Sequence, residues 1–409
     1  MARVAIIADD LSGAADCGMA FRRYGLDTAV FVSADLADSG AADVVAVDTD
    51  SRSMDPAAAS RAVTVAVRRL GTPEVVYKKV DSTLRGNLAV EVATALLATH
   101  TSFAVVAPAF PSTGRTTRDG RQYVAGRPVE ETAIWRDAGL GGRADLPTLL
   151  ATVGLRAQVV PLSTVRAGLC DCLARLADDG VDAAVCDAET DDDLAAVAAA
   201  TAQLGRRVLW TGSAGLAYHV PGALKFAPDA GANDRVSGTS GPVVTVVGSA
   251  SEVAQRQAAR VVGQAGVIAV RLQSRALASS GRDAEVERAG RALAAALAEG
   301  QDVVLTLEPA VLPRQSSVAR EAAVALGAVV QPYSSQFGGL VLTGGDTARA
   351  VLLALGSPGV RLEVEVGPGV SRGRLLGALA VPVITKAGAF GDAQTLNRSR
   401  LALHEQSSA

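Results

Sequence analysis

The chain has 409 residues, of which 49% are hydrophobic and only 20% charged, so it is long enough to bury the cores of roughly two or three domains. Its net charge of −3 leaves no basic surplus for binding a nucleic-acid backbone. Its apolar runs are far shorter than the about 20 residues that cross a bilayer, so we expect neither a nucleic-acid partner nor a membrane protein.

Cysteine and histidine are too scarce for several common kinds of site. The four cysteines have neither the number of a disulfide framework nor the spacing of a zinc site. The three histidines show no metal-ligand spacing, which argues against histidine-centred catalysis and predicts no metal site on the protein. Acidic residues follow one short apolar run at the N-terminus without a secretory cleavage pattern, so we expect a cytoplasmic protein.

Short β-branched runs alternate with alanine-rich stretches of helical period, a pattern typical of parallel strands joined by crossover helices. The predicted fold class is therefore α/β. The predicted strands are 4–8, 28–32, 44–47, 75–79, 104–107, 158–161, 183–186 and 207–210, then 243–247, 267–270, 303–307, 340–342 and 382–385.

Residues 221–242 interrupt this alternation with Gly, Pro, Ala and Asp and no sustained period, which indicates an interdomain connection. We therefore expect an N-terminal domain over 1–230 and a C-terminal domain over 240–409, both α/β with mainly parallel sheets, and an active-site cleft between them. Ligands of open parallel sheets bind at the carboxyl ends of the strands, so the loops after strands are the places to look for chemistry.

The first predicted strand runs directly into Asp9, Asp10 and Ser12, at the start of a helix. One of the two carboxylates could hold a substrate hydroxyl or act as a base, and Ser12 could bond the ligand. Alternatively, Asp10 or Ser12 only caps the helix. This motif alone leaves both interpretations open.

A second polar segment, residues 77–87, also lies between a strand and a helix. Arg85 offers a planar fork to a substrate carboxylate, Lys79 a point charge, and Asp81 an acceptor for a hydroxyl or a proton. In the structural alternative, Asp81 pairs internally with Arg85 or Lys79, and Ser82 caps the helix.

Residues 107–120 predict a long binding loop after the fifth strand, stiffened by prolines and opened to close backbone approach by Gly114. Arg115, with Thr116, could face an anionic group. A solvated surface arginine is the alternative.

In the second half, three strand-to-helix turns carry glycine or small residues: 247–251, 341–348 and 383–392. The Gly344-Gly345 turn, with a helix expected from Thr347, predicts a cradle of backbone N–H groups for phosphate. Lys386 adds a charge for neutralisation in the third turn. Neither a P-loop nor a dinucleotide fingerprint is present. Together with the cations and carboxylates of the first half, these turns favour a phosphoryl transferase, with Mg²⁺ bridging nucleotide phosphates and a carboxylate orienting the attacking hydroxyl.

Six motifs, at 8–16, 78–87, 107–120, 212–217, 344–348 and 386–392, resemble those of the four-carbon acid sugar kinase family, in family order and across nearly the whole chain. They read ADDLSGAAD, KKVDSTLRGN, APAFPSTGRTTRDG, GSAGLA, GGDTA and KAGAFGD. The resemblance implies ATP-dependent phosphorylation of the terminal 4-hydroxyl of an acid such as threonate, erythronate or 3-oxo-tetronate. It also implies that the N-terminal domain binds the sugar acid and the C-terminal domain binds ATP, with Mg²⁺ carried by the nucleotide.

Carried over by position, the resemblance assigns roles to individual residues. The implied substrate contacts are Asp10, Lys79, Asp81, Ser82, Arg85 and Arg115. The implied nucleotide contacts are Ser249 or Ser251, the turn formed by Gly344, Gly345, Asp346 and Thr347, and the loop with Gly388, Phe390 and Gly391. The sequence departs from the family at Ser12, where Thr is usual, and at Ala387, where Ser is frequent.

For the catalytic carboxylate, we expect Asp10 or Asp81 rather than Asp392. The alternatives to a kinase are a non-catalytic sensor of sugar acid and nucleotide, or a nicotinamide-dependent hydroxy-acid dehydrogenase. A homodimer is the default expectation for such an enzyme.

Overall fold

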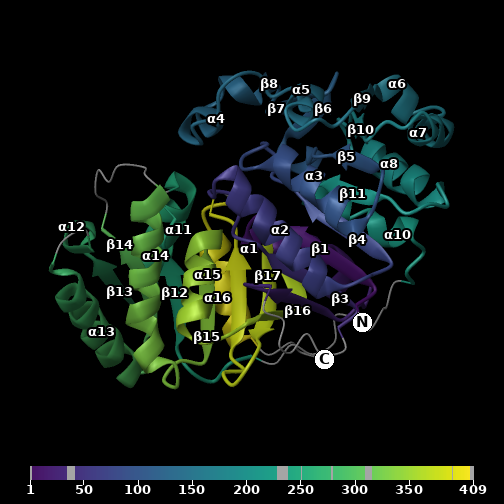
Figure 1. The fold of residues 1–409 in the computed structure, drawn as a ribbon. Helices are drawn as coiled ribbons and strands as arrows, with labels where there is room; N and C mark the ends of the chain where they lie inside the picture. The colour runs from purple at the N-terminus through teal and green to yellow at the C-terminus, as the bar shows by residue number, and fades with distance from the viewer. Residues whose placement is uncertain are drawn as a thin grey trace. The chain divides into compact units, whose positions relative to one another are not determined.

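The computed structural model describes residues 2–34, 42–227, 238–249, 251–277, 280–308, 316–388 and 390–405. The chain forms two compact units, the first comprising Met1–Ala29 and Ser33–Asp229, the second Val30–Val32 and Ala230–Ala409. Both are α/β units (Figure 1). Of the predicted connection at 221–242, residues 228–237 lie outside the described residues. Within the described ranges, no helix has the length and apolarity needed to cross a membrane.

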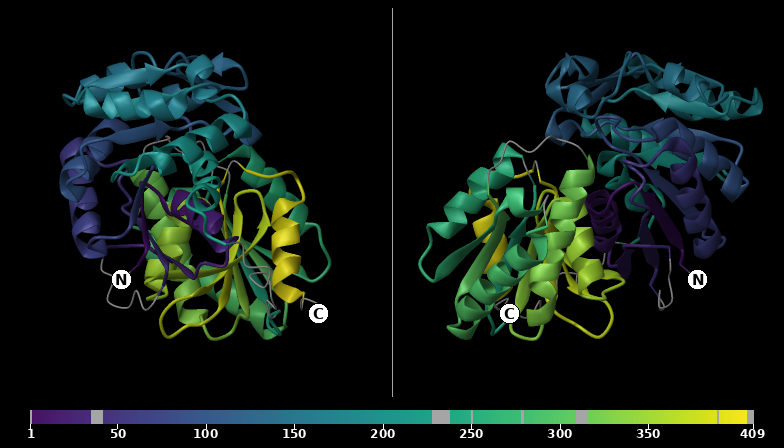
Figure 2. Two further views of the ribbon diagram at one scale, coloured as in Figure 1. Left: turned by 90° about the vertical axis from the view of Figure 1, so that its right-hand side faces the viewer. Right: turned by 60° about the vertical axis from the view of Figure 1, so that its left-hand side comes forward.

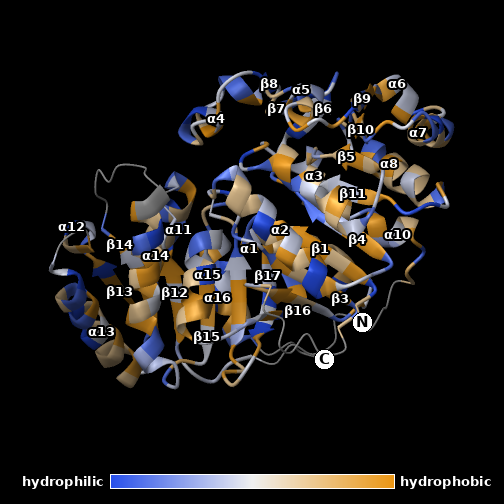
Figure 3. Cartoon of the chain, in the orientation of Figure 1, coloured by the Kyte–Doolittle hydropathy of each residue, from blue (hydrophilic) through white to orange (hydrophobic). Residues whose placement is uncertain are grey.

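The sheet of the first unit is wholly parallel, in the order β3-β1-β4-β11-β5-β10-β9. Its strands are β1 (Val4–Ala8), β3 (Val44–Asp48), β4 (Val75–Lys79), β5 (Ala104–Ala107), β9 (Ala157–Val160), β10 (Ala183–Cys186) and β11 (Leu209–Gly212), with β2 (Thr28–Phe31) ending in the second unit. The inner strands are buried along their whole length, as expected where both faces are covered. Strand β1 is hydrophobic throughout (Figure 3), whereas β4 ends in two lysines. Strand β11 starts two residues later than the predicted strand 207–210, because Arg207 is exposed and the buried run begins after it.

The helices of the first unit pack against this sheet and against one another; α1 contacts α9, and α2 contacts α3. They are α1 (Leu11–Arg22), α2 (Pro56–Leu70), α3 (Leu88–Thr99), α4 (Ala133–Asp137), α5 (Leu146–Ala151), α6 (Leu162–Val165), α7 (Leu169–Asp178), α8 (Asp191–Gln203), α9 (Ala214–Ala217) and α10 (Val220–Ala223).

The prediction of one long loop over 107–120 is wrong for its second half. A short 3₁₀ turn (Pro111–Thr113) leads into a small antiparallel sheet of β6 (Arg115–Arg118), β7 (Arg121–Val124) and β8 (Arg127–Pro128). Asp119 and Gly120 both adopt positive φ between paired Arg118 and Arg121, the geometry of a tight hairpin turn. The Asp-Gly pair was the available signal, but the flanking strands are polar and give no hydrophobic alternation.

The second unit has a sheet in the order β13-β14-β12-β15-β18-β17-β16, shown from further sides in Figure 2. Its parallel strands are β12 (Val243–Val247), β13 (Val267–Leu272), β14 (Asp302–Leu307), β15 (Gly339–Thr343) and β18 (Pro382–Lys386). Two antiparallel strands complete it, β16 (Gly359–Gly367) and β17 (Val370–Leu375). The sequence analysis missed this hairpin, whose strands mix charged and apolar residues and meet at the Pro368-Gly369 turn.

Helices α13, α14 and α15 form one packed group in the second unit, and α11 and α16 another. The helices are α11 (Glu252–Val262), α12 (Ser274–Leu277), α13 (Arg282–Ala298), α14 (Ser316–Val330), α15 (Gly345–Ala354) and α16 (Thr395–His404), with a 3₁₀ turn at Gln331–Tyr333. Helix α15 begins at Gly345 rather than at the predicted Thr347. The reason is that Gly344, with φ of 97°, already turns the chain and serves as N-cap.

A buried ion pair supports the first unit beneath the strand ends. Lys78 of β4 and Glu91 of α3 lie 2.7 Å apart with side chains 0% and 2% exposed. Lys78 also donates to the carbonyls of Ile7 and Lys79, and Glu91 accepts from Ser51 at 2.6 Å. The pair therefore connects β1, β4, α3 and the loop after β3.

Replacing Glu91 by Ala leaves the Lys78 ammonium buried without its carboxylate. We expect Glu91→Ala to lower the free energy of unfolding of the first unit by about 3–5 kcal/mol. Urea titration followed by circular dichroism measures this change. Glu74→Ala is the control, because it removes an exposed ion pair with Arg3 and is expected to cost no more than about 1 kcal/mol. Equal losses in the two variants would contradict the prediction.

Candidate active site

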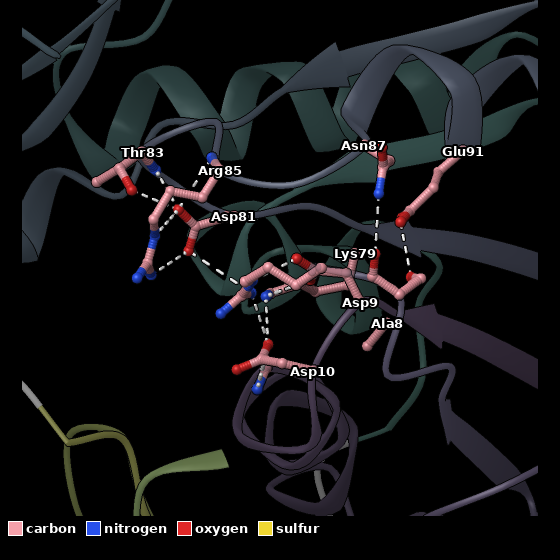
Figure 4. A network of polar contacts seen from close by, with 12 residues as sticks. Ala8, Asp9, Asp10, Lys79, Asp81, Thr83, Arg85, Asn87 and Glu91 are labelled. Atoms are coloured by element: carbon pink, nitrogen blue, oxygen red, sulfur yellow. Dashed lines mark hydrogen bonds and ion pairs between the residues drawn. The ribbon is translucent and has the colours of Figure 1, made fainter. Parts of the chain in front are cut away.

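Charged side chains gather where three neighbouring strands of the first unit end. Strands β3, β1 and β4 are adjacent and parallel, so their carboxyl ends meet at one edge. Asp9 and Asp10 follow β1, Arg52 follows β3, and Lys79 ends β4. Asp81 and Arg85 come in the loop after β4. Figure 4 shows this network.

Arg52 contacts all three carboxylates of the network. Its Nε donates to Asp9 Oδ2 at 2.6 Å, and its Nη2 donates to Asp10 Oδ1 at 2.8 Å. The same Nη2 lies 3.6 Å from Asp81 Oδ1. Arg52 thus joins the ends of β1 and β4 from the loop after β3.

Lys79 bridges the two adjacent aspartates. Its ammonium lies 3.0 Å from Asp9 Oδ1 and 2.9 Å from Asp10 Oδ1. Gly13, in the first turn of α1, leaves the space for this ammonium, because a Cβ at Gly13 would overlap Lys79 Nζ. The glycine of the Leu-Ser-Gly motif is therefore explained by the lysine opposite it.

Asp10 is both a helix cap and part of the ionic network. Its Oδ1 accepts from the Gly13 N–H at 3.2 Å as well as from Arg52 and Lys79. Among the described residues, no hydrogen bond reaches Oδ2, and Figure 4 shows this oxygen turned away from the dashed contacts, on the same side as the Arg85 guanidinium. Asp10 keeps one oxygen available for a ligand.

Asp81 differs, because both of its oxygens are already used. Arg85 pairs with it through Nε and Nη2, each at 2.8 Å, and Oδ2 also accepts from the Thr83 backbone N–H and hydroxyl. The internal pairing considered from the sequence is present. Ser82, however, does not cap a helix, because α3 starts after Asn87 and the N-cap position belongs to that residue.

Electrostatics keeps these carboxylates ionised. Burial by itself raises the pKa of Asp9, but Arg52 and Lys79 outweigh it and hold the pKa well below its usual value. For Asp81, burial is likewise outweighed by Arg85 and Arg52, and its pKa is lowered. Burial lowers the pKa of Lys79, yet Asp10 and Asp9 raise it further than burial lowers it.

Arg115, at the start of β6, adds a further cation beside this network. The pKa of Arg115 is lowered below its usual value. Burial is the main cause and the charge of Arg85 adds to it, while Asp81 acts in the opposite direction. The hairpin is joined to the loop after β4 by Gln122 of β7, whose fully buried amide donates to the Ser82 carbonyl at 2.7 Å and accepts from Thr117. Around Asp9, Asp10 and Asp81 there are thus Arg52, Lys79 and Arg85, with Arg115 as an additional positive charge.

In the second unit, the structure brings together the three turns selected from the sequence. They follow β12, β15 and β18, which are neighbours in the sheet. A Cβ at Gly388 would overlap the Ser249 side chain, and one at Gly248 would overlap Thr347 Oγ1. The close approach of these loops therefore depends on glycine.

Fewer backbone N–H groups of this cluster are available to a phosphate than the Gly344-Gly345 turn predicted. The Gly344 N–H already donates to the Lys386 carbonyl at 2.8 Å. Within the described ranges, the N–H groups of Gly345, Asp346 and Thr347 have no hydrogen-bond partner, as is usual in the first turn of a helix. Ser251 caps α11 through the Ala254 N–H and donates its hydroxyl to the Gly388 carbonyl at 2.8 Å.

Lys386 was expected to neutralise phosphate, but its contacts are with its own loop. Its buried ammonium donates to the carbonyls of Ala387, Gly388 and Phe390, at 2.8, 3.4 and 2.8 Å. Burial lowers the pKa of Lys386 to about 8. Lys386 therefore shapes the loop. Asp392 is bound to Gln394, Thr395 and Arg398 at the start of α16.

Comparisons with known proteins match a different domain model to each half of the chain. Residues 4–220 match the model of a sugar-binding N-terminal domain, and residues 244–396 that of a nucleotide-binding C-terminal domain. A D-threonate kinase of Cupriavidus necator is 44% identical, over 96% of this chain and 95% of that protein. The chain belongs to the four-carbon acid sugar kinase family. A D-erythronate kinase of Heliobacterium modesticaldum is 30% identical, over 96% of this chain and 95% of that protein.

A solved structure from Salmonella typhimurium LT2 has the same fold as this kinase-family chain. The two align with a TM-score of 0.80 at 25% identity, over 97% of this chain and 98% of the other. The α/β class expected from the sequence is confirmed.

Sequence reasoning missed Asp9 as an ionic partner and Arg52 altogether. Asp9 stands next to Asp10, but only the structure shows that both pair with the same cations. Arg52 lies in the loop after a predicted strand, Asp48-Thr49-Asp50-Ser51-Arg52, which has the charge density used to select the other loops. That loop is held by Asn87, whose amide donates to the carbonyls of Ser51 and Met54, each at 2.9 Å.

The variant Gly13→Ala tests the close approach of α1 to Lys79. Its Cβ would displace the ammonium from between Asp9 and Asp10, so we expect kcat/KM to fall on the order of 10²-fold, as for other displaced positioning groups. Steady-state kinetics and the melting temperature are measured together. Gly263→Ala is the control, because the nearest atom to its Cβ is 3.6 Å away. Unchanged kinetics in Gly13→Ala would show that Lys79 tolerates displacement.

Proposed function

We propose that this protein is an ATP-dependent kinase that phosphorylates the terminal 4-hydroxyl of a four-carbon sugar acid, with D-threonate as the first candidate. The 44% identity to a D-threonate kinase, compared with 30% to a D-erythronate kinase, supports this order of candidates. The cytoplasmic location and the homodimer expected from the sequence remain predictions.

The observation that carries the proposal is the charge composition of the first site. Asp9, Asp10 and Asp81 are matched by Arg52, Lys79 and Arg85. Asp81 also acts on Arg115, against the lowering of its pKa by burial. A sugar acid offers one carboxylate to the guanidinium groups at this site, and its hydroxyls suit the Asp10 oxygen that accepts no hydrogen bond from a described residue.

Asp10 is the better of the two expected catalytic carboxylates. Its Oδ2 is available to accept a hydrogen bond from the attacking hydroxyl, whereas Arg85 and Thr83 occupy both oxygens of Asp81. Phosphoryl transfer depends mainly on positioning and charge stabilisation, so an ionised carboxylate that orients the hydroxyl suffices. We assign Asp81 to positioning: it holds Arg85.

For the nucleotide, we propose the cluster after β12, β15 and β18, which gives the domain over 240–409 the ATP-binding role and that over 1–230 the acid-binding role. The N–H groups of Gly345, Asp346 and Thr347 and the hydroxyl of Ser249 suit phosphate oxygens at the positive end of α15. The loop of Gly388, Phe390 and Gly391, held by Lys386, borders Ser249. Mg²⁺ would arrive on the phosphates and neutralise their charge.

ADP release from ATP and Mg²⁺ tests the function. The acids to compare are D- and L-threonate, D- and L-erythronate and the 3-oxo-tetronates, and we expect D-threonate to give the highest kcat/KM. Product analysis by mass spectrometry and NMR should place the phosphate on O4. Nucleotide and acid binding without ADP formation would instead support a sensor, and turnover of another acid would reassign the substrate.

Asp10→Asn separates catalysis from helix capping. Asn is as good an N-cap as Asp, so α1 should persist, while loss of the charged acceptor should reduce kcat by about 10²- to 10⁴-fold. Asp55→Asn is the matched control, because Asp55 caps α2 in the same way and is exposed. A kcat of Asp10→Asn close to that of the parent would remove Asp10 from catalysis.

For Asp81→Asn we expect mainly a higher KM for the acid.

A further inference from the structure

Arg52 is held in a single orientation by contacts along one edge of its guanidinium. Nε and Nη2 bind Asp9 and Asp10, and Asp9 is itself only 3% exposed. The remaining nitrogen, Nη1, makes no hydrogen bond to any described residue. With the Arg52 side chain 23% exposed, this donor is left available at the surface of the network.

Arg85 is held in the same manner from the other side of Asp81. Its Nε and Nη2 bind the Asp81 carboxylate, and its Nη1 has no hydrogen bond among the described residues. Both Nη2 atoms approach the same oxygen, Asp81 Oδ1, at 3.6 Å from Arg52 and 2.8 Å from Arg85. One carboxylate oxygen therefore sets the spacing of the two guanidinium groups.

The two guanidinium groups meet at Asp81, which raises the pKa of Arg85, while the positive charge of Arg52 acts to lower it. Neighbouring cations repel one another, so this pair is stabilised when an anion binds to it. A guanidinium already fixed by carboxylates also loses little conformational freedom when the ligand arrives.

We propose that Arg52 is a substrate-binding residue, which together with Arg85 holds the carboxylate of the sugar acid, each arginine donating through its free Nη1. The inference rests on the proposed function, which supplies the acid. Arg52 accordingly determines specificity for acids over neutral polyols. Asp9 is the positioning residue that fixes the Arg52 edge.

The alternative is that Arg52 only neutralises Asp9 and Asp10. Two substitutions distinguish the roles. Arg52→Lys keeps the positive charge but lacks the separate Nη1 donor, while Arg52→Gln loses the charge. If Arg52 binds substrate, both variants should raise KM for the acid by about 10- to 150-fold, the value of a hydrogen bond to a charged group. The change in KM is the diagnostic result, because both variants also lose the Arg52–Asp10 contact and their kcat is expected to fall as well.

A purely neutralising role predicts a different pattern. Arg52→Lys would then restore the parent KM, and only Arg52→Gln would be impaired; this result would overturn the proposal. Arg61→Lys, at an exposed position of α2, is the matched control. Melting temperatures of all variants identify losses caused by unfolding.

A crystal structure of the parent protein with the acid bound decides the question even if the variants do not fold. A carboxylate oxygen within about 3.2 Å of Arg52 Nη1 supports the proposal. A carboxylate bound elsewhere overturns it while leaving the kinase function intact. If the parent protein neither binds nor turns over any of the acids, the proposed function itself fails, and this inference with it.

Discussion

The mutual neutralisation of Asp9 and Asp10 by Arg52 and Lys79 is the interaction on which the first site depends. Two adjacent carboxylates at the end of a buried strand would repel each other and lose hydration. A lysine from β4 and an arginine from the loop after β3 remove that penalty, and in doing so they join three strand ends. The absence of a side chain at Gly13 is a requirement of the same arrangement.

The two units offer anions different kinds of donor. In the first, fixed guanidinium groups present directional donors, which suit the planar carboxylate of a small acid. In the second, backbone N–H groups at the start of α15 have no hydrogen-bond partner among the described residues, and such groups suit the less directional charge of phosphates. The Lys386 ammonium donates to loop carbonyls and therefore shapes the loop after β18.

Support behind the first site comes from polar groups that are fully buried. Lys78 and Glu91 connect the strands to α3, while Gln122 attaches the hairpin bearing Arg115 to the Ser82 carbonyl. Such groups hold a fixed geometry because each has a partner, and removing one leaves the other unsatisfied in a low-dielectric interior. The arginines can therefore be positioned before any substrate binds.

The sequence by itself determined the α/β class and most of the parallel strands, because buried strands are continuous apolar runs. It also predicted several loops as sites of the chemistry, because glycine turns are local signals. It did not reveal the polar hairpins at 115–124 and 359–375, which lack that hydrophobic pattern. Tertiary structure alone decided that Arg52 meets Asp9, that Asp81 is saturated while Asp10 is not, and that Lys386 faces its own loop. Those outcomes depend on which strand ends become neighbours, and strand order is set by long-range packing that no local pattern encodes.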